Sequence, residues 1–336
     1  MDKVLTISIA AYNIERFMDE TLKSFIIPEI ADKIEVVIVN DGSKDNTSIK
    51  AHSYAKQYPD LFVVIDKPNG GYGSTINASS RAARGKYFKT IDGDDWVDQN
   101  GIVKLVKYLS TCDDDIVITN FQRVHDLTRK TTPTVFSCSK YETSLVFDSE
   151  YSDQLLFMQA ISIKTEILKR LELSITEHCF YTDIEYILTP VPQINTISFL
   201  NTFVYMYRIA VNEQSMSVEG KRKHIDEQLL VLKKMTMYYK NLRSSLGRGK
   251  QRYFITILSE MYKSHVTAIL SLTISKLAKQ RLTDIESYMR ETVPDIYSET
   301  NRYRTIRVLR NTNYLAYAPG SLAYKAYQRV LKLLRR

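Results

Sequence analysis

Short runs of β-branched and aromatic residues alternate with helical patterns through the first 120 residues, and this alternation constrains the fold of the 336-residue chain most strongly. The predicted strands span residues 4–10, 34–40, 61–66, 86–91 and 115–120. The stretches between them that carry helical spacing are 14–25, 45–57, 74–84 and 98–109. Such a succession of strand, helix and strand predicts a mostly parallel sheet covered by helices.

The pattern changes twice further along the chain. From residue 121 to about residue 206, short alternating segments indicate an antiparallel extension that completes the first domain. Beyond Lys221 apolar residues recur at spacings of three and four, which predicts helices over residues 225–242, 251–279 and 283–290. We therefore predict an α/β catalytic domain over residues 1–220 and a basic α-helical domain over residues 221–336.

Charge divides the chain at the same place. Residues 221–336 hold 24 Lys and Arg against 8 Asp and Glu, a net charge of +16. Residues 1–220 hold 22 against 30, a net charge of −8. The cationic second part predicts an anionic partner, either a membrane surface or a nucleic acid.

Cysteine usage and hydropathy bear on the compartment. The three cysteines, Cys112, Cys138 and Cys179, are widely spaced and odd in number, which favours reduced core thiols in a cytoplasmic protein. No run of about 18 apolar residues occurs, and the N-terminus lacks the layout of a signal peptide. We expect a cytoplasmic protein that does not span the membrane, with peripheral contact to its inner face left open.

Three carboxylates, those of Asp92, Asp94 and Asp95, directly follow the predicted strand 86–91. Carboxylates crowded at the rim of a sheet repel one another unless a cation neutralises them, and hard divalent ions prefer oxygen ligands. The crevice beyond the carboxyl ends of the strands is also where open α/β sheets bind ligands. The cluster therefore predicts a metal site, and the alternative is a solvated acidic turn.

Polar and glycine-rich turns also follow the three preceding strands, at residues 11–13, 40–43 and 69–73. Because parallel strands end at one edge of their sheet, we expect these turns to lie beside the acidic cluster. Asp41 brings a carboxylate to this crevice. Gly70 and Gly71 precede a predicted helix and allow the backbone to approach a nucleotide or phosphate closely.

These segments resemble the family 2 glycosyltransferases that use nucleotide-sugar donors and have the GT-A fold, including enzymes of bacterial cell-surface polysaccharide synthesis. The resemblance covers most of residues 1–220. It is carried by ISIAAYN, EVVIVNDGSKDNT, KPNGGYGSTIN and GKYFKTIDGDDW, and more weakly by FYTDIEY and VYMYRIAVNEQSMS.

The resemblance implies an inverting transfer of a sugar from a UDP-sugar to a hydroxyl of a glycan or lipid-linked acceptor, with Mn²⁺ or Mg²⁺ as cofactor. It implies that Asp41 accepts a hydrogen bond from the base, that Asp92 binds the ribose, and that Asp94, helped by Asp95, holds the metal. Asp95 has two alternative roles, orienting the acceptor or capping the next helix. The residues implied to bind the donor are Ala11, Tyr12, Asn13, Asp41, Asn69, Gly70, Gly71, Asn77, Asp92, Gly93 and Arg208.

An inverting transferase needs a base that takes a proton from the acceptor hydroxyl, and a carboxylate suits that role. Asp183 matches the position at which related enzymes place this base, although Thr182 stands where a glutamate usually precedes it. Glu177 and Glu185 are competing carboxylates. The alternative role for Asp183 is capping of the helix that follows it.

The C-terminal segment 321–336 is predicted to form an amphipathic helix. Its apolar side carries Ala323, Ala326, Tyr327, Val330 and Leu334, and its basic side carries Lys325, Arg329, Lys332 and Arg336. Such a helix suits the interface of an anionic membrane, or it docks on the helical domain with its charges solvated.

A different class of function is a basic, helical nucleic-acid-binding protein with a nucleotide-binding domain. No recognised nucleic-acid motif occurs in the basic region, so we expect no nucleic-acid partner. A dinucleotide-dependent oxidoreductase is disfavoured because no G-x-G-x-x-G follows the first strand. A second copy of the chain stays open as a partner.

Overall fold

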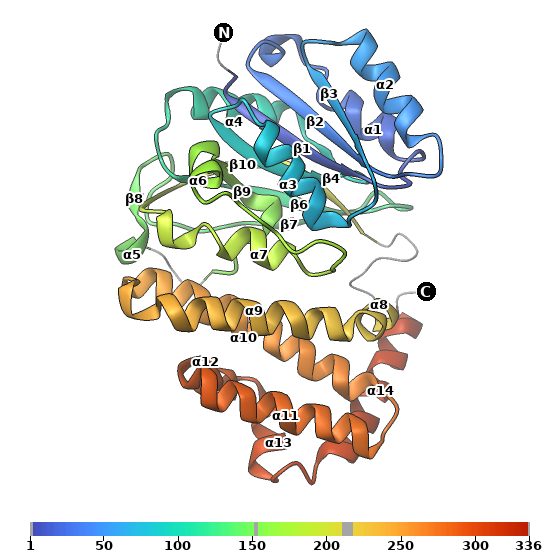
Figure 1. Ribbon diagram of the computed structural model, residues 1–336, viewed down its shortest axis with the longest axis vertical. Helices are drawn as coiled ribbons and strands as arrows, with labels where there is room; N and C mark the ends of the chain where they lie inside the picture. The colour runs from blue at the N-terminus through green and yellow to red at the C-terminus, as the bar shows by residue number, and fades with distance from the viewer. Residues whose placement is uncertain (1–2, 151–153, 210–217, 335–336) are drawn as a thin grey trace. The chain divides into compact units, whose positions relative to one another are not determined.

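The computed structural model describes residues 3–150, 154–209 and 218–334. The chain forms two compact units, residues 1–212 and residues 213–336 (Figure 1). The first unit contains the sheet, and the described part of the second unit is helical. Each unit is considered separately below.

Four parallel strands form one half of the sheet in the first unit. In spatial order they are β3 (Phe62–Lys67), β2 (Ile34–Asp41), β1 (Leu5–Ala11) and β4 (Tyr87–Asp92). Strands β1 and β2 are buried almost throughout, because their Ile, Val and Leu side chains pack on both faces of the sheet. The predicted parallel sheet is confirmed.

The other half of the sheet mixes strand directions. Strand β9 (Ile161–Lys164) lies antiparallel between β4 and β6 (Ile116–His125), and β10 (Thr196–Ile209) lies parallel to β6. Three short strands pair antiparallel at the margins, and they are β5 (Trp96–Val97), β7 (Thr131–Thr134) and β8 (Leu145–Val146). This half corresponds to the predicted antiparallel extension.

Helices connect the strands as the alternating pattern predicted (Figure 1). Those of the first unit are α1 (Met18–Lys23), α2 (Thr47–Gln57), α3 (Tyr72–Ala82), α4 (Gln99–Thr111), α5 (Phe147–Glu150), α6 (Thr165–Arg170) and α7 (Asp183–Leu188), with 3₁₀ turns at Pro28–Ile30, Met158–Ala160 and Val191–Gln193. Helix α4 begins where the Asp98 carboxylate accepts a hydrogen bond from the Gly101 amide at 2.7 Å.

The second unit is built from α8 (Val218–Lys223), α9 (Ile225–Leu242), α10 (Arg248–Ser271), α11 (Lys276–Thr292), α12 (Pro294–Glu299), α13 (Arg304–Asn311) and α14 (Tyr317–Leu334), with 3₁₀ turns at Arg243–Ser245 and Thr300–Arg302. The prediction of one helix over residues 251–279 is wrong. Helix α10 ends at Ser271, and α11 starts afresh because the Ser275 hydroxyl accepts a hydrogen bond from the Ala278 amide at 3.1 Å. Among the described residues, none of the helices is long and apolar enough to cross a bilayer.

A fully buried lysine lies in the middle of β4. The Lys89 amino group donates to the carbonyl oxygens of Gln159 at 2.7 Å and Ile161 at 3.2 Å. Burial lowers the pKa of Lys89 to about 7. The side chain in the unfolded chain titrates near its ordinary pKa of about 10.4, so the unfolded state binds more protons between these two values.

We therefore expect the free energy of unfolding to rise as pH increases from about 7 towards 10, as the cost of burying a charged Lys89 disappears. Urea unfolding at pH 7 and at pH 9.5 measures this rise. The Lys89→Met protein is expected to show a smaller rise over the same interval. An identical pH dependence in the two proteins would contradict this assignment.

Candidate functional site

The turns that follow β1 and β2 contact each other at one edge of the sheet. The Asn13 side-chain carbonyl accepts a hydrogen bond from the Lys44 amide at 2.8 Å, and the Asn13 amide donates to the Ser43 hydroxyl at 3.1 Å. Asn13 has a φ of 52°, a left-handed conformation that asparagine tolerates well. Ala11 is buried, whereas Tyr12 is 46% exposed at the edge.

Asp41 joins the end of β2 to the glycine turn that follows β3. Its carboxylate accepts hydrogen bonds from the amides of Gly70 and Gly71, both at 2.8 Å. Lys67 Nζ donates to the same carboxylate at 2.7 Å, and the Ser74 hydroxyl donates to it at 3.2 Å. Three of these bonds reach Oδ1 of Asp41 and one reaches Oδ2. The Asp41 carboxylate therefore shapes the glycine turn, and its implied contact with the base stays a prediction.

Two other residues implied to bind the donor also bond the chain itself. The Asn69 side-chain amide donates to the carbonyl oxygen of Asp41 at 3.0 Å. Asn77 is buried, and its side chain bonds both the amide and the carbonyl of Ile175, at 2.8 and 2.9 Å. Asn77 thereby fixes the segment that leads towards Asp183.

The acidic residues after β4 occupy different environments. Asp92 and Asp94 are half-buried, whereas Asp95 is fully buried. The Asp95 carboxylate accepts hydrogen bonds from the Tyr205 hydroxyl at 2.7 Å and from the Arg208 amide at 2.6 Å. Because both oxygens of Asp95 accept bonds from β10, its carboxylate anchors the loop. Capping of the next helix, the alternative role for Asp95, is performed by Asp98.

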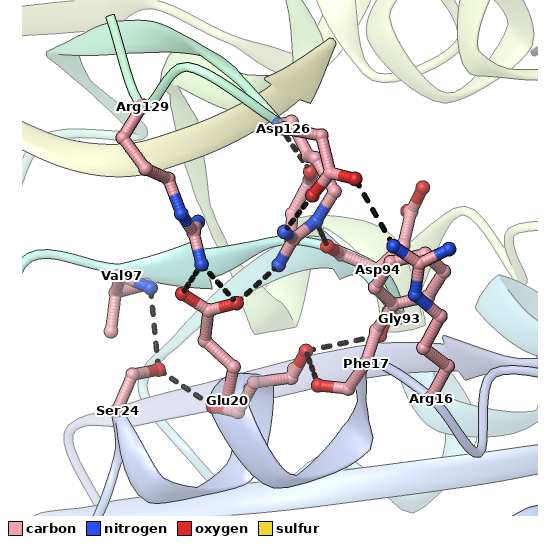
Figure 2. Close-up of polar contacts among 12 residues, drawn as sticks. Arg16, Phe17, Glu20, Ser24, Gly93, Asp94, Val97, Asp126 and Arg129 are labelled. Carbon is pink, nitrogen blue, oxygen red and sulfur yellow. Dashed lines mark hydrogen bonds and ion pairs between the residues drawn. The ribbon is translucent and has the colours of Figure 1, made fainter. Parts of the chain in front are cut away.

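Arg208 lies next to this loop but bonds protein groups. It is 2% exposed, and its Nε donates to the Asp94 carbonyl oxygen at 2.6 Å. Its two terminal nitrogens bond Asp126 at 2.6 Å and Glu20 at 2.7 Å (Figure 2). All three guanidinium nitrogens therefore have protein partners, which favours a structural role for Arg208 over the donor contact that the resemblance implied.

Gly93 leaves no room for a side chain at the start of the acidic loop. A Cβ atom at this position would lie 2.4 Å from the Ala10 carbonyl oxygen and 2.6 Å from the Ile14 side chain. We expect Gly93→Ala to lower the free energy of unfolding by about 1–3 kcal/mol, as overpacking typically does. Chemical denaturation measures this loss.

The matched control for this substitution is Gly320→Ala. Gly320 lies in helix α14, and a Cβ atom added there would meet no heavy atom of the described chain within 4 Å. There the change is expected to raise stability by about 0.5–1 kcal/mol through helix propensity. Equal effects of the two substitutions would contradict the close approach at Gly93.

The carboxylates of Asp92 and Asp94 are electrostatically unfavourable where they lie. Burial, followed by the charge of Asp94, raises the pKa of Asp92, and burial raises the pKa of Asp94. Arg208 opposes the shift in the pKa of Asp94 from a distance. In the described part of the chain, no lysine or arginine forms an ion pair with either carboxylate.

Asp183 is the first residue of α7 and is half-buried. Burial raises its pKa, and hydrogen bonds from nearby amides oppose the shift. The charge of Asp183 contributes to the raised pKa of Asp92, so these carboxylates share one electrostatic environment. Of the competing carboxylates, Glu185 is buried and accepts a bond from the Thr176 amide at 3.0 Å, whereas Glu177 is exposed.

Three tyrosines surround these carboxylates and were missed from the sequence. Burial and the charge of Asp92 raise the pKa values of Tyr72 and Tyr205. The pKa of Tyr207 is raised by burial and by several charges, with Asp92 contributing most among them. The signal that could have identified two of them is the alternation in Val204–Arg208, which places Tyr205 and Tyr207 on one face of β10.

The carboxylate oxygens of Asp92 and Asp94 fit a hard divalent ion that substrate phosphates also help to hold. The described residues contain no group of three or more His, Cys, Asp or Glu that could hold a metal by itself. Mg²⁺ is usually bound through one or two carboxylates together with substrate phosphates. The carboxylates of Asp92 and Asp94, which have no cationic partner among the described residues, supply that kind of half-site.

Comparison with known proteins agrees with this architecture. Residues 6–168 match the sequence model of the family described as Glycosyl transferase family 2. An uncharacterized glycosyltransferase of Bacillus subtilis, EpsJ, is 26% identical over 235 residues, which cover 68% of this chain and 67% of EpsJ. The minor teichoic acid biosynthesis protein GgaB of the same organism is 32% identical over 108 residues, covering 32% of this chain but 12% of GgaB.

The fold also has a counterpart among solved structures. Residues 1–349 of S. aureus TarS, crystallised with UDP-GlcNAc, superpose with a TM-score of 0.67 at 17% identity. The superposition covers 97% of this chain and 92% of the TarS chain. The TarS superposition shows the fold. The matched family model shows that residues 6–168 belong to glycosyl transferase family 2 and that the protein is a glycosyltransferase.

Proposed function

We propose that the protein transfers a sugar from a UDP-sugar to a hydroxyl of a glycan or lipid-linked acceptor, with inversion, in bacterial surface-polysaccharide synthesis. The observation that carries this proposal is the position of Asp92 and Asp94 at the carboxyl end of β4, without a cationic partner in the described part of the chain. The charge of a third carboxylate, Asp183, contributes to the raised pKa of Asp92, and burial raises the pKa of Asp183. The UDP-GlcNAc bound by TarS and the teichoic acid synthesis named for GgaB support the choice of donor and polymer class.

In this proposal Asp94 holds Mn²⁺ or Mg²⁺ against the donor diphosphate, and Asp92 bonds the ribose. The ion, when bound, neutralises charge that develops on the departing diphosphate. The carboxylate of Asp95 and the backbone of Gly93 keep the loop in place. The partial burial of Asp92 and Asp94 lowers the effective dielectric constant around them and strengthens their attraction for a cation.

Asp183 acts as the general base. Its carboxylate accepts the proton of the acceptor hydroxyl while that oxygen bonds to the anomeric carbon. The bond from this carbon to the UDP oxygen breaks, and UDP leaves with the electron pair. One displacement from the opposite face inverts the anomeric configuration. A raised pKa makes Asp183 a stronger base than an ordinary aspartate.

A thermal-shift panel of nucleotide sugars, each with and without Mn²⁺, tests the donor. A donor present at 100 times its dissociation constant stabilises the folded protein by about 2.7 kcal/mol. We expect a UDP-sugar to raise the melting temperature only when Mn²⁺ is present. No response to any uridine nucleotide, or a response to a guanosine nucleotide sugar alone, would overturn the proposed donor.

We also propose that α14 contacts an anionic membrane surface at which lipid-linked acceptors lie. The helix turns Ser321 towards α10, where its hydroxyl donates to the Leu270 carbonyl at 2.7 Å. Its apolar side chains Leu322, Tyr327 and Val330 are 61%, 58% and 52% exposed. From residue 301 onward the chain has nine basic and no acidic residues. The side chains of Arg329, Lys332, Leu334 and Arg336, which the sequence also assigned to this helix, lie outside the described residues.

Flotation with vesicles tests this contact. The protein is expected to float with vesicles that contain phosphatidylglycerol and to stay behind with pure phosphatidylcholine, because each basic residue near an anionic surface contributes about 1 kcal/mol. Leu322→Asp with Val330→Asp should abolish flotation. Ile49→Asp, which changes an exposed apolar residue of the first unit, is the control. Unchanged flotation of the α14 variant would contradict the proposal.

A further inference from the structure

Two carboxylates outside the acidic loop, those of Glu20 and Asp126, hold Arg208 in place. Glu20 lies on α1 and accepts a bond from one terminal nitrogen of Arg208 at 2.7 Å. Asp126 follows β6 and accepts a bond from the other terminal nitrogen at 2.6 Å. The remaining nitrogen, Nε, donates to the Asp94 carbonyl oxygen at 2.6 Å. Figure 2 shows Glu20, Asp126 and Asp94 close together, with dashed lines for the polar contacts among the residues drawn.

Each residue of the acidic loop is fixed by a contact to another part of the first unit, although the Asp94 carboxylate itself forms no ion pair among the described residues. Three contacts fix the backbone: Asp92 N–H to the Tyr205 hydroxyl at 3.0 Å, the Thr21 hydroxyl to the Gly93 carbonyl at 3.0 Å, and Arg208 Nε to the Asp94 carbonyl. The Arg208 amide donates to the Asp95 carboxylate. The direction of the Asp94 Cα–Cβ bond, from which the carboxylate projects, is therefore set by these contacts.

Arginine is the side chain that this position requires. The guanidinium group contacts two aromatic rings, with its central carbon 4.8 Å from the Phe17 centroid and 4.7 Å from the Trp96 centroid. Its three nitrogens bond three different groups around the edge of the guanidinium plane. A lysine keeps the charge but lacks the planar fork, so it cannot reach all three partners from one position.

We propose that Arg208, braced by Glu20 and Asp126, is a positioning residue that orients Asp94 for the metal ion and donor diphosphate. The inference rests on the proposed function, because it concerns the same metal half-site. Partners that orient a metal ligand from outside the coordination sphere typically contribute 10- to 100-fold to metal affinity or activity. Arg208 thus acts on the metal through the Asp94 backbone, without touching the substrate.

The experiment measures Mn²⁺ affinity of the full-length protein by electron paramagnetic resonance of free Mn²⁺, with UDP present. Arg208→Lys and Arg208→Gln are each expected to weaken Mn²⁺ binding about 10-fold or more. The matched control is Arg129→Ala, because Arg129 also pairs with Glu20, at 3.0 Å, and lies over Trp96. The guanidinium of Arg129 bonds Glu20 and makes no bond to the acidic loop among the described residues. The Mn²⁺ affinity of the Arg129→Ala protein should therefore stay within about twofold of the wild-type value.

Rescue by lysine separates positioning from charge. Wild-type Mn²⁺ affinity in Arg208→Lys, together with loss in Arg208→Gln, would overturn the proposal because charge alone would then suffice. Circular dichroism checks folding of each variant. Where an Arg208 variant does not fold, the double variant Glu20→Gln, Asp126→Asn replaces it, with an expected loss of about 10-fold. Wild-type affinity in that protein overturns the inference, whereas absence of Mn²⁺ binding by the wild type overturns the proposed function itself.

Discussion

Replacing Asp183 with asparagine is expected to reduce kcat about 100- to 10,000-fold, the usual contribution of general acid–base catalysis. Donor binding should change little, because Asp183 acts on the acceptor hydroxyl and has no assigned contact with the nucleotide. The side chains have nearly the same shape, so folding should be preserved. Steady-state kinetics with the donor identified by thermal shift, together with donor affinity from calorimetry, measure both quantities.

The pH profile gives a second test of the same residue. Burial raises the pKa of Asp183, and a base must be deprotonated to work. Activity is therefore lost as pH falls through this raised pKa, and the acidic limb of kcat/KM lies above the range of an ordinary aspartate. Glu177→Gln is the control, since Glu177 is exposed and close in sequence. Near-full turnover by Asp183→Asn, or an equal loss in the control, would contradict the assignment.

Replacing Asp94 with asparagine is expected to lower kcat/KM by a factor of about 100 or more. A bound divalent ion contributes several kcal/mol of charge stabilisation, and each 1.4 kcal/mol is a factor of about ten in rate. The loss should be accompanied by a weaker dependence of activity on Mn²⁺ concentration. A Mn²⁺ titration of initial rates measures both effects.

The control for Asp94 is a carboxylate of the same unit whose removal is tolerated. Asp113 serves because its side chain is 81% exposed and it lies before β6, in a loop that carries no part of the proposed site. Asp113→Asn is expected to keep the wild-type Mn²⁺ dependence. If Asp94→Asn keeps it as well, the metal half-site lies elsewhere in the chain.

The alternating pattern of the first 120 residues could be predicted because each element there satisfies its own period. Strands β1 and β2 are rich in Ile and Val and buried almost throughout, and α4 has a capping aspartate at Asp98. The prediction of one long helix from residue 251 was wrong because the local pattern there does not show where the helix ends. Its apolar spacing continues across Leu272, and only the Ser275 cap marks the break between α10 and α11.

The sequence placed the polar turns after neighbouring parallel strands, but it could not predict which groups each polar side chain bonds. Asp41 and Asp95 both lie at or next to the ends of strands. The Asp41 carboxylate accepts hydrogen bonds from amides of the glycine turn, whereas the Asp95 carboxylate accepts them from groups on β10. These partners lie about 30 and 110 residues away in sequence. Glu20 and Asp126 belong to no recognisable motif, because an ion pair with a residue far along the chain produces no local pattern in the sequence.

The measurement that tests the metal half-site most directly is a calorimetric titration of the protein with UDP, first in Mn²⁺ and then in EDTA. We predict clear binding in Mn²⁺ and at least about tenfold weaker binding in EDTA, because Asp94 would contact the diphosphate only through the ion. Equal affinity in the two buffers, or no binding of UDP in either, would contradict the claim that these carboxylates hold a metal-bound UDP-sugar.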